Sequence, residues 1–181
     1  MIIKPWMKWL IPIFFTLTIC FYFPSFFIDN GTITIVGIIL LTMFFHIVIK
    51  PFLAIITVNL LDNVIKKDLR WFNVNRCETL LFTILMVKKW KKFLPTYDKS
   101  AFDIKNTPIE KIIYSTKRAE VFHETTFLLS FLPLFLIIPY KLVWFFIITS
   151  VIGALMELIF VIEQRFNRPR LCKVALKKIK R

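Results

Sequence analysis

The sequence predicts an all-α integral membrane protein with about four transmembrane helices and a cytoplasmic, membrane-associated amphipathic insertion. Of the 181 residues, 57% are hydrophobic, against about 45–50% in an ordinary soluble domain. The 25 Lys and Arg residues outnumber the 11 Asp and Glu residues, which gives a formal net charge of +14. The uncharged residues gather in long runs, so the basic residues are expected to lie outside the bilayer.

The first predicted span covers residues 9–28, twenty positions without a charge. About 20 apolar residues are needed to cross the hydrocarbon core of a membrane. A cleaved signal peptide is the alternative, because Lys4 and Lys8 precede the run. A signal peptide would have a shorter apolar region, about 7–15 residues, and a cleavage site of small residues. This run is longer and ends in bulky side chains at 26–28, so we expect a retained helix.

The second predicted span, residues 32–49, follows the turn-forming residues 29–31 (DNG). Lys50 and Pro51 interrupt this apolar run, yet residues 52–61 are again apolar. Ten residues are too few to cross a bilayer alone. They therefore either extend the second span as a long, Pro-kinked helix or lie along the membrane interface.

The third and fourth predicted spans are residues 121–138 and 142–162, separated by a short turn at 139–141 (PYK). A basic tail follows at 164–181, in which eight of eighteen residues are Lys or Arg. No repeat or flexible linker divides the chain, so we expect residues 1–181 to form a single membrane domain.

The distribution of basic residues predicts the orientation of these spans. With both termini in the cytoplasm, 24 of the 25 basic residues face the cytoplasm and only Lys141 lies in an outer turn. Cytoplasmic segments of membrane proteins carry the excess of Lys and Arg. We therefore expect a multi-pass protein of the cell membrane with both termini in the cytoplasm.

The segment 62–120 is predicted to be a cytoplasmic insertion that lies against the membrane. Aromatic side chains such as Trp71 alternate there with basic runs such as 88–92 (KKWKK). Trp beside Lys is typical of the headgroup region, so anionic membrane lipids, and not nucleic acid, are the expected partners. A loop is predicted between Pro95 and Pro108, with a helix resuming after it.

The chain has none of the common nucleotide-loop, serine-hydrolase or zinc-protease motifs. Its three cysteines, Cys20, Cys77 and Cys172, form no CxxC pair and lie in different parts of the chain. We therefore expect neither a structural disulfide nor a metal site.

One helical face carries a candidate catalytic pair. Thr116, Glu120, His123 and Phe127 recur at helical spacing, which makes Glu120 and His123 neighbours. A carboxylate can fix the tautomer of an imidazole and raise its basicity, so Glu120 would orient His123 as a general base. The alternative is an ion pair on the helix surface. The other histidine, His46, is expected to pack near the end of the second span.

Two further features suggest polar sites. Glu157 lies about four turns into the fourth span, where an ionised carboxylate costs a few kcal/mol. It must be protonated, face a polar cavity or have a partner, and His123, Arg118 and His46 are the candidates. Beyond it, three arginines within residues 165–170 are stiffened by a proline. Such forked donors suit a phosphate or a carboxylate.

Residues 116–123 (TKRAEVFH), followed after one hydrophobic hairpin by 164–171 (QRFNRPRL), resemble the glycosyl-4,4'-diaponeurosporenoate acyltransferases. These small membrane proteins attach a fatty acyl chain to the sugar of a glycosylated carotenoid, the last step to staphyloxanthin. Residues 87–92 (VKKWKK) are also similar to a basic, aromatic segment of that family. The resemblance covers about residues 70–175.

The resemblance implies acyl transfer from acyl-CoA or acyl carrier protein to a hydroxyl of a glycolipid, such as a glycosyl carotenoid, without a bound cofactor. His123 would deprotonate that hydroxyl and Glu120 would orient His123. Other residues are expected to bind substrates: Arg118, Glu157, Gln164, Arg165, Asn167, Arg168, Arg170, Lys89 and Trp90. The alternatives are a non-enzymatic accessory subunit and a lipid-binding protein or transporter that uses Glu157.

Overall fold

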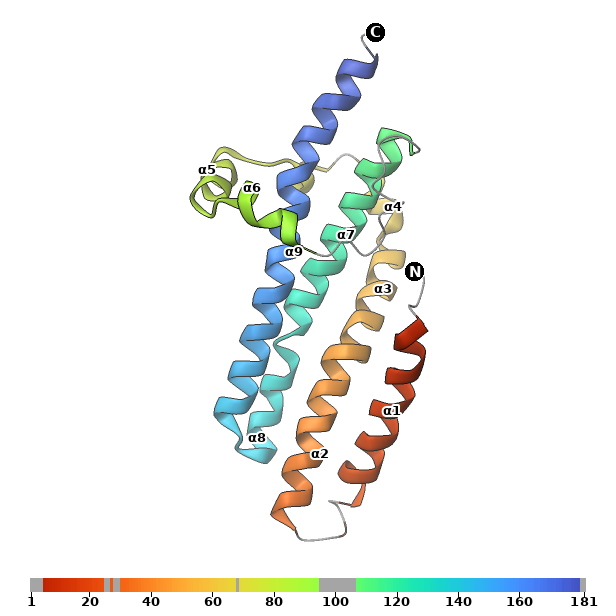
Figure 1. Cartoon of the computed structure of the whole chain (residues 1–181), viewed down its shortest axis with the longest axis vertical. Coiled ribbons are helices and arrows are strands. Elements are labelled where there is room, and N and C mark those ends of the chain that lie inside the picture. Colours follow the sequence, from red (N-terminus) through yellow and green to blue (C-terminus); the bar gives the residue numbers. More distant parts are fainter. Residues whose placement is uncertain (1–4, 25–26, 28–29, 68, 95–106, 180–181) are drawn as a thin grey trace.

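The structure is a computed structural model of the chain. It describes residues 5–24, 27, 30–67, 69–94 and 107–179, with the backbone alone at 5–10 and 178–179. Every regular element within these ranges is helical, which confirms the all-α class (Figure 1). The side chains of Lys4 and Lys8 and the predicted loop from Pro95 through residue 106 lie outside the described residues.

The elements follow one another along the chain with short connections. The α-helices are α1 (Pro5–Tyr22), α2 (Gly31–Phe44), α3 (Lys50–Leu60), α4 (Asp62–Ile65), α5 (Arg76–Ile84), α6 (Val87–Trp90), α7 (Ile109–Leu129), α8 (Ile137–Tyr140) and α9 (Val143–Ile179). One π-helical turn (Phe45–Ile49) and the 3-10 turns Arg70–Phe72, Lys91–Phe93 and Leu132–Leu136 complete the set.

α2 begins at the predicted turn. Asn30 caps the helix, because its Oδ1 accepts hydrogen bonds from the backbone N–H groups of Thr32 (3.0 Å) and Ile33 (3.3 Å). α1 and α2 pack side by side, and the end of α1 comes very close to Gly37. A Cβ atom there would lie 2.9 Å from the Tyr22 Cα, so only glycine fits at this crossing.

The segment 52–61 continues the helix of the second predicted span, as the first of the two alternatives expected. α2, the π turn and α3 form a continuous helix from Gly31 to Leu60. Pro51 has no N–H to donate and lies in the first turn of α3, where the chain tolerates proline. The wider π turn precedes it, with the Lys50 N–H bonded to the Phe45 carbonyl.

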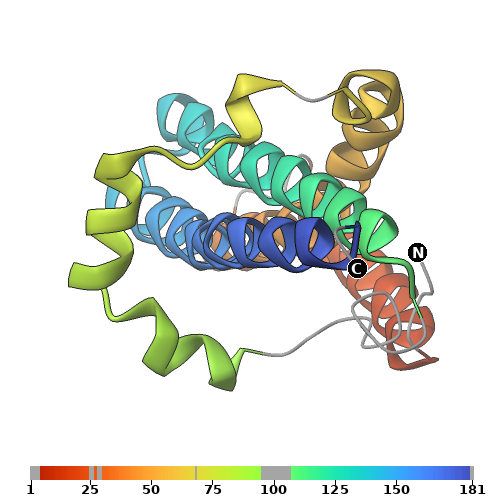
Figure 2. The ribbon, with the colours of Figure 1, turned by 90° about the horizontal axis from the view of Figure 1, so that it is seen from above.

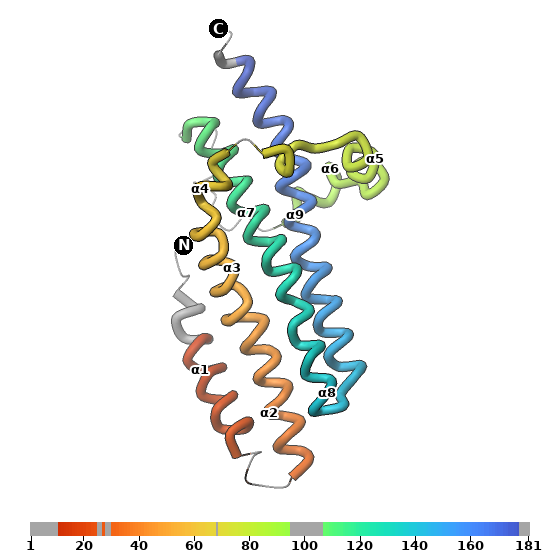
Figure 3. The backbone as a smooth tube through the Cα atoms, turned by 180° about the vertical axis from the view of Figure 1, so that it is seen from behind, coloured from red at the N-terminus to blue at the C-terminus, as the bar shows by residue number. Residues whose placement is uncertain are grey.

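Three helical segments are long and apolar enough to cross a membrane: Gly31–Leu60, Ile109–Tyr140 and Val143–Lys177. The described apolar part of α1 is shorter, Ile11–Tyr22. α7 packs along α9, α3 packs along α7, and α1 packs on α2. These segments run side by side (Figure 3).

The connections divide the molecule into two ends. The short turns between α1 and α2 and between α8 and α9 lie at one end of the bundle (Figures 1 and 3). The start of α1, the end of α9 and the insertion with α4, α5 and α6 lie toward the other end. Seen from above, α5 and α6 lie outside α9 and away from α1 (Figure 2). The alternation of short and long connections is the one expected from the sequence.

Candidate active site

His123 and Glu157 form a pair between α7 and α9. The His123 Nδ1 lies 2.8 Å from the Glu157 Oε2, and both side chains are largely buried. The Phe160 ring, one turn further along α9 than Glu157, stacks on the imidazole with 4.8 Å between centroids. Of the three partners that the sequence leaves open for Glu157, the structure brings His123 to it.

Lys50 completes this group, and sequence reasoning missed it. Its Nζ lies 2.9 Å from the other carboxylate oxygen of Glu157 and 3.2 Å from the Ser130 Oγ. Lys50 is only 4% exposed. In the sequence it stands beside Pro51 at what resembles the end of a span. It is buried because the helix continues past it.

His46 packs against α9 and makes no hydrogen bond to Glu157. It lies on the π turn, and a Cβ atom at Gly153 would be 3.2 Å from its Cε1. Both ring nitrogens are buried and have no hydrogen-bond partner within the described ranges. The absence of a side chain at Gly153 lets α9 approach this ring. Its position is that of a packed histidine, as expected.

The Nε2 atom of His123 is the part of this pair that can act as a base. When Nδ1 carries the proton and donates it to Glu157, Nε2 is left with a lone pair that can accept a proton. Nε2 has no hydrogen-bond partner in the part of the chain that the structure describes, and the side chain is 19% exposed. The arrangement matches a general base held by a carboxylate, with Lys50 balancing the charge.

Glu120 has a different place from the one expected. Its carboxylate is fully buried and ion-pairs with Arg165, at 2.5 Å between Oε1 and Nη1, and with Arg168. Glu120 and His123 are neighbours on α7, but α9 offers each a different partner. The arginines lie at least two turns beyond Glu157 on α9, so Glu120 meets the arginines and His123 meets Glu157.

The same two arginines hold the insertion against α9. Arg165 donates to the Trp71 carbonyl at 3.1 Å and ion-pairs with Glu78 at 2.7 Å. Arg168 donates to the Phe72 carbonyl at 2.8 Å. Their Nη donors, expected to bind a substrate phosphate, therefore already have protein partners, whereas both Nε atoms are buried with no hydrogen-bond partner among the described residues. This network fixes segment 70–78 beside α7 and α9.

Arg118 is placed away from His123. It ion-pairs with Asp62 of α4 and donates to the Asn59 Oδ1 at 2.9 Å and to the Tyr114 hydroxyl at 3.2 Å. The pKa of Asp62 is lowered to about 2, first by the hydrogen bond from Lys66, which has the larger effect, and then by the one from Tyr114. This cluster ties α7 to the end of the second span, and the structure does not bring it to the histidine.

The remaining residues of the 164–171 motif lie at the end of α9 that faces the insertion. Asn167 accepts a hydrogen bond from the Lys91 Nζ at 2.5 Å, and burial lowers the pKa of Lys91. The Arg170 guanidinium lies 3.8 Å from the Phe166 ring centroid and is exposed. Gln164 is half-buried on the same helix. Arg170 is thus the most exposed arginine of the motif.

The basic, aromatic segment of the insertion is on the surface. Lys89 is exposed, and Trp90 is half-buried with its indole N–H donating to the Leu85 carbonyl at 2.8 Å. No group of three or more His, Cys, Asp or Glu side chains in the described ranges could hold a metal ion. Neither Lys89 nor Trp90 contacts the His123 group.

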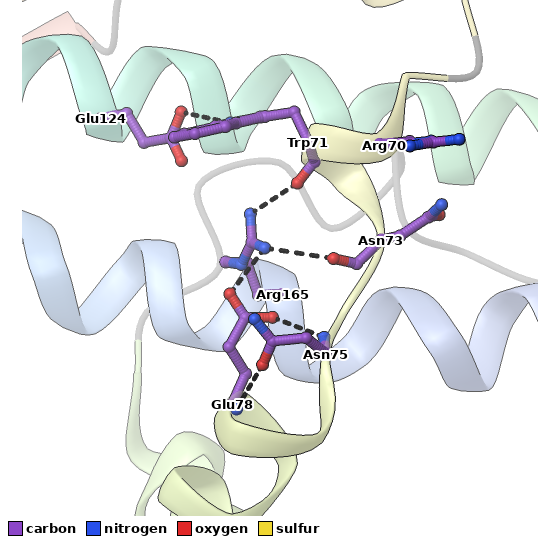
Figure 4. Close-up of a pocket in the computed structure, with 7 residues that line it drawn as sticks. All are labelled: Arg70, Trp71, Asn73, Asn75, Glu78, Glu124 and Arg165. Carbon is purple, nitrogen blue, oxygen red and sulfur yellow. Dashed lines mark hydrogen bonds and ion pairs between the residues drawn. The ribbon is translucent and has the colours of Figure 1, made fainter.

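A pocket of about 410 Å³ lies beside the Glu120 network (Figure 4). Five residues of segment 70–78 line it together with Glu124 of α7 and Arg165 of α9. Asn75 begins α5 with a capping box, in which Asn75 and Glu78 each accept a hydrogen bond from the other's backbone N–H. Sequence reasoning missed this pocket, because its three walls are 41 or more positions apart in the chain.

The family model described as glycosyl-4,4'-diaponeurosporenoate acyltransferase matches residues 68–177. No curated protein and no solved structure matches the chain. The match spans the insertion after α4, α7 and most of α9. It includes His123, Glu157 and the Glu120 network, whereas Lys50 and His46 precede it. The chain belongs to the glycosyl-4,4'-diaponeurosporenoate acyltransferase family.

Proposed function

We propose that the protein is a membrane acyltransferase that moves a fatty acyl group from an acyl thioester to a hydroxyl on the sugar of a glycosylated carotenoid. Membership of the family supports an acyltransferase of carotenoid glycolipid synthesis. The His123–Glu157 pair carries the proposal, because it offers a base with a free ring nitrogen between apolar helices. Neither a bound cofactor nor a metal is required.

In the proposed reaction, the His123 Nε2 takes the proton of the acceptor hydroxyl as the oxygen attacks the thioester carbonyl. A carbon–oxygen bond forms, the carbon–sulfur bond breaks, and the leaving thiolate takes the proton from the imidazolium. Glu157 stabilises that imidazolium through Nδ1. Lys50 keeps the Glu157 carboxylate ionised and in place. Neither serine nor cysteine forms a covalent intermediate.

The proposal assigns Glu120 a structural task in place of the expected orienting one. Its two partners, Arg165 and Arg168, hold the insertion against α9. Glu120 therefore positions segment 70–78 and not the imidazole of His123. Arg170 is the remaining candidate for the donor's phosphates, because it is exposed and its fork is not held by a carboxylate. A bidentate arginine is not replaced by lysine. Arg170→Lys should raise the apparent KM for the thioester donor and leave that for the acceptor unchanged.

Turnover by the purified protein tests this function. In a bilayer, with acyl-CoA or acylated carrier protein and a glycosyl carotenoid, we expect an ester on the sugar and a free thiol in equal amounts. Mass spectrometry of the product and a thiol assay measure the two. Absence of product with both donors would contradict the enzymatic function and favour an accessory subunit.

We also propose that the protein has four spans, with both termini and the insertion in the cytoplasm. The short turns lie at one end of the bundle and the basic segments at the other (Figure 1). The insertion exposes apolar side chains beside its lysines, which suits a headgroup layer: Trp71, Leu80, Leu81, Ile84, Leu85, Met86 and Phe93.

This topology predicts the accessibility of tags. A reporter fused after Arg181 should be active on the cytoplasmic side, and one inserted at Asn30 should be external, because the chain crosses the membrane once before Asn30. Compartment-specific enzymatic reporters measure both positions. A cytoplasmic signal at both sites would contradict a membrane-spanning α1.

A further inference from the structure

The pocket beside the Glu120 network has the composition of a polar binding site. Its lining comes from segment 70–78, from Glu124 and from Arg165, and every lining side chain carries a hydrogen-bonding group. Such a lining is unusual beside helices whose outer surfaces are apolar. A ligand of this pocket must therefore be polar where it enters, even if it is attached to a lipid.

Several polar groups in the pocket are not used by the protein. The Arg165 guanidinium is held by Glu120 and Glu78, and the Trp71 indole N–H donates to the Glu124 Oε2 at 3.2 Å (Figure 4). In contrast, the Asn73 amide and the Arg70 guanidinium make no side-chain hydrogen bond to any described residue. Together with the second oxygen of Glu124, they provide donors and acceptors for a ligand.

The charge of the pocket favours a neutral ligand. Arg70 and Arg165 are matched by Glu78 and Glu124, and Arg165 is further neutralised by Glu120. A phosphate would meet two carboxylates without an excess of positive charge. A polyhydroxyl compound needs mixed donors and acceptors without net charge, which this lining supplies.

Trp71 adds an apolar surface to these hydrogen-bonding groups. It is 62% exposed, yet its ring is tethered to Glu124. An exposed, fixed indole offers a flat face for the C–H side of a sugar ring, while its edge stays polar. Asparagine, carboxylate and guanidinium groups around one indole therefore suit a pyranose.

We propose that this pocket binds the sugar headgroup of the acyl acceptor, an assignment that rests on the proposed function. Glu124 follows His123 directly in α7, so the stretch of helix that carries the base also supplies one wall of the pocket, although His123 itself does not line it. Leu128, one turn further along α7, is 68% exposed. The apolar chain of the acceptor would continue along α7 from this point into the membrane.

Equilibrium binding to the full-length protein in lipid nanodiscs, without a thioester donor, tests the assignment. The probes are a synthetic glucosyl lipid and the same lipid alcohol without its sugar. Trp71→Ala should weaken binding of the glucosyl lipid about tenfold, because the contact between the sugar and the indole ring is lost. A tenfold loss of affinity is comparable in free energy to one or two hydrogen bonds. Binding of the parent alcohol should not change.

Matched variants separate the sugar site from general effects. Trp144→Ala removes another exposed tryptophan, at the far end of α9, and should leave both affinities unchanged. Trp71→Phe should keep most of the affinity because it retains a flat ring. Asn73→Ala should weaken binding of the glucosyl lipid alone, because the Asn73 amide makes no side-chain hydrogen bond to any residue that the structure describes.

Two outcomes distinguish this assignment from the proposed function. If transfer proceeds with an unchanged acceptor KM in Trp71→Ala and Asn73→Ala, the pocket is not the sugar site and the acyltransferase function stands. If binding depends on the sugar and on Trp71 but no thioester supports transfer, the pocket assignment stands and the proposed reaction is wrong.

Discussion

His123→Ala should abolish nearly all acyl transfer while the protein still assembles in the membrane. General-base catalysis contributes about 10²–10⁴-fold to a rate, so we expect turnover to fall by that factor. His123→Gln should fall as far, because an amide fills a similar space and cannot take the proton. Turnover of purified protein in bilayers, with a thioester and a glycosyl lipid, measures both.

Variants of the partners test whether His123 and Glu157 act together. Glu157→Gln would leave Lys50 buried without a counter-charge, so we pair it with Lys50→Met to preserve folding. The triple variant, with His123→Ala added to Glu157→Gln and Lys50→Met, should turn over only slightly more slowly than His123→Ala alone. The effects of substituting residues that act as one unit are not additive.

The other histidine provides the control for these changes. His46→Gln is the same substitution at a residue that makes no hydrogen bond to Glu157, and it should retain turnover near that of the unchanged protein. Near-normal turnover of His123→Ala would rule out the general-base mechanism and favour the accessory-subunit alternative.

Glu120→Gln should have the largest effect on stability. The carboxylate is fully buried between Arg165 and Arg168, which are themselves largely buried. Removing one member of a buried ion pair costs about 3–5 kcal/mol, because the remaining charge is left without compensation. For a chain of this size that corresponds to a fall of about 6–20 °C in the midpoint of thermal unfolding.

Two further variants assign the cause of that loss. Glu110→Gln makes the same change at an exposed position of α7 and should shift the midpoint little. Adding Arg168→Met to Glu120→Gln should recover part of the stability, since one of the two buried arginines that face the amide is then removed. A normal midpoint for Glu120→Gln, with a changed pH profile of turnover, would instead support the orienting role expected from the sequence.

The helices could be predicted from the sequence because uncharged runs and breakers are local signals. Asn30 caps α2 as the turn before it suggests, and the family resemblance is confirmed by a match over 68–177. The continuity of the helix through Pro51 could not be predicted. A proline after a lysine occurs at the end of a span and also at a π turn inside one.

The sequence indicated which polar residues need a partner, but it did not indicate which partner each of them has. The helical spacing in the sequence makes Glu120 and His123 neighbours on α7. It does not show which side chains of α9 lie opposite each of them. Glu157 was expected to need a partner and has His123, whereas Lys50 comes from a helix 107 residues earlier in the chain. Contacts of that separation depend on helix packing, which one sequence does not reveal.

The Glu120 network also affects how the protein is made. Glu120 leaves the ribosome 45 residues before Arg165, so α7 emerges with a carboxylate whose partner has not been synthesised. The buried Glu120 carboxylate can therefore reach its arginines only after more than half of α9 has been synthesised. Segment 70–78 is translated before both helices, yet its carbonyls receive their donors only when α9 is complete. The contacts that hold segment 70–78 against α9 therefore form only after the two arginines, about 90 residues later in the chain, have been made.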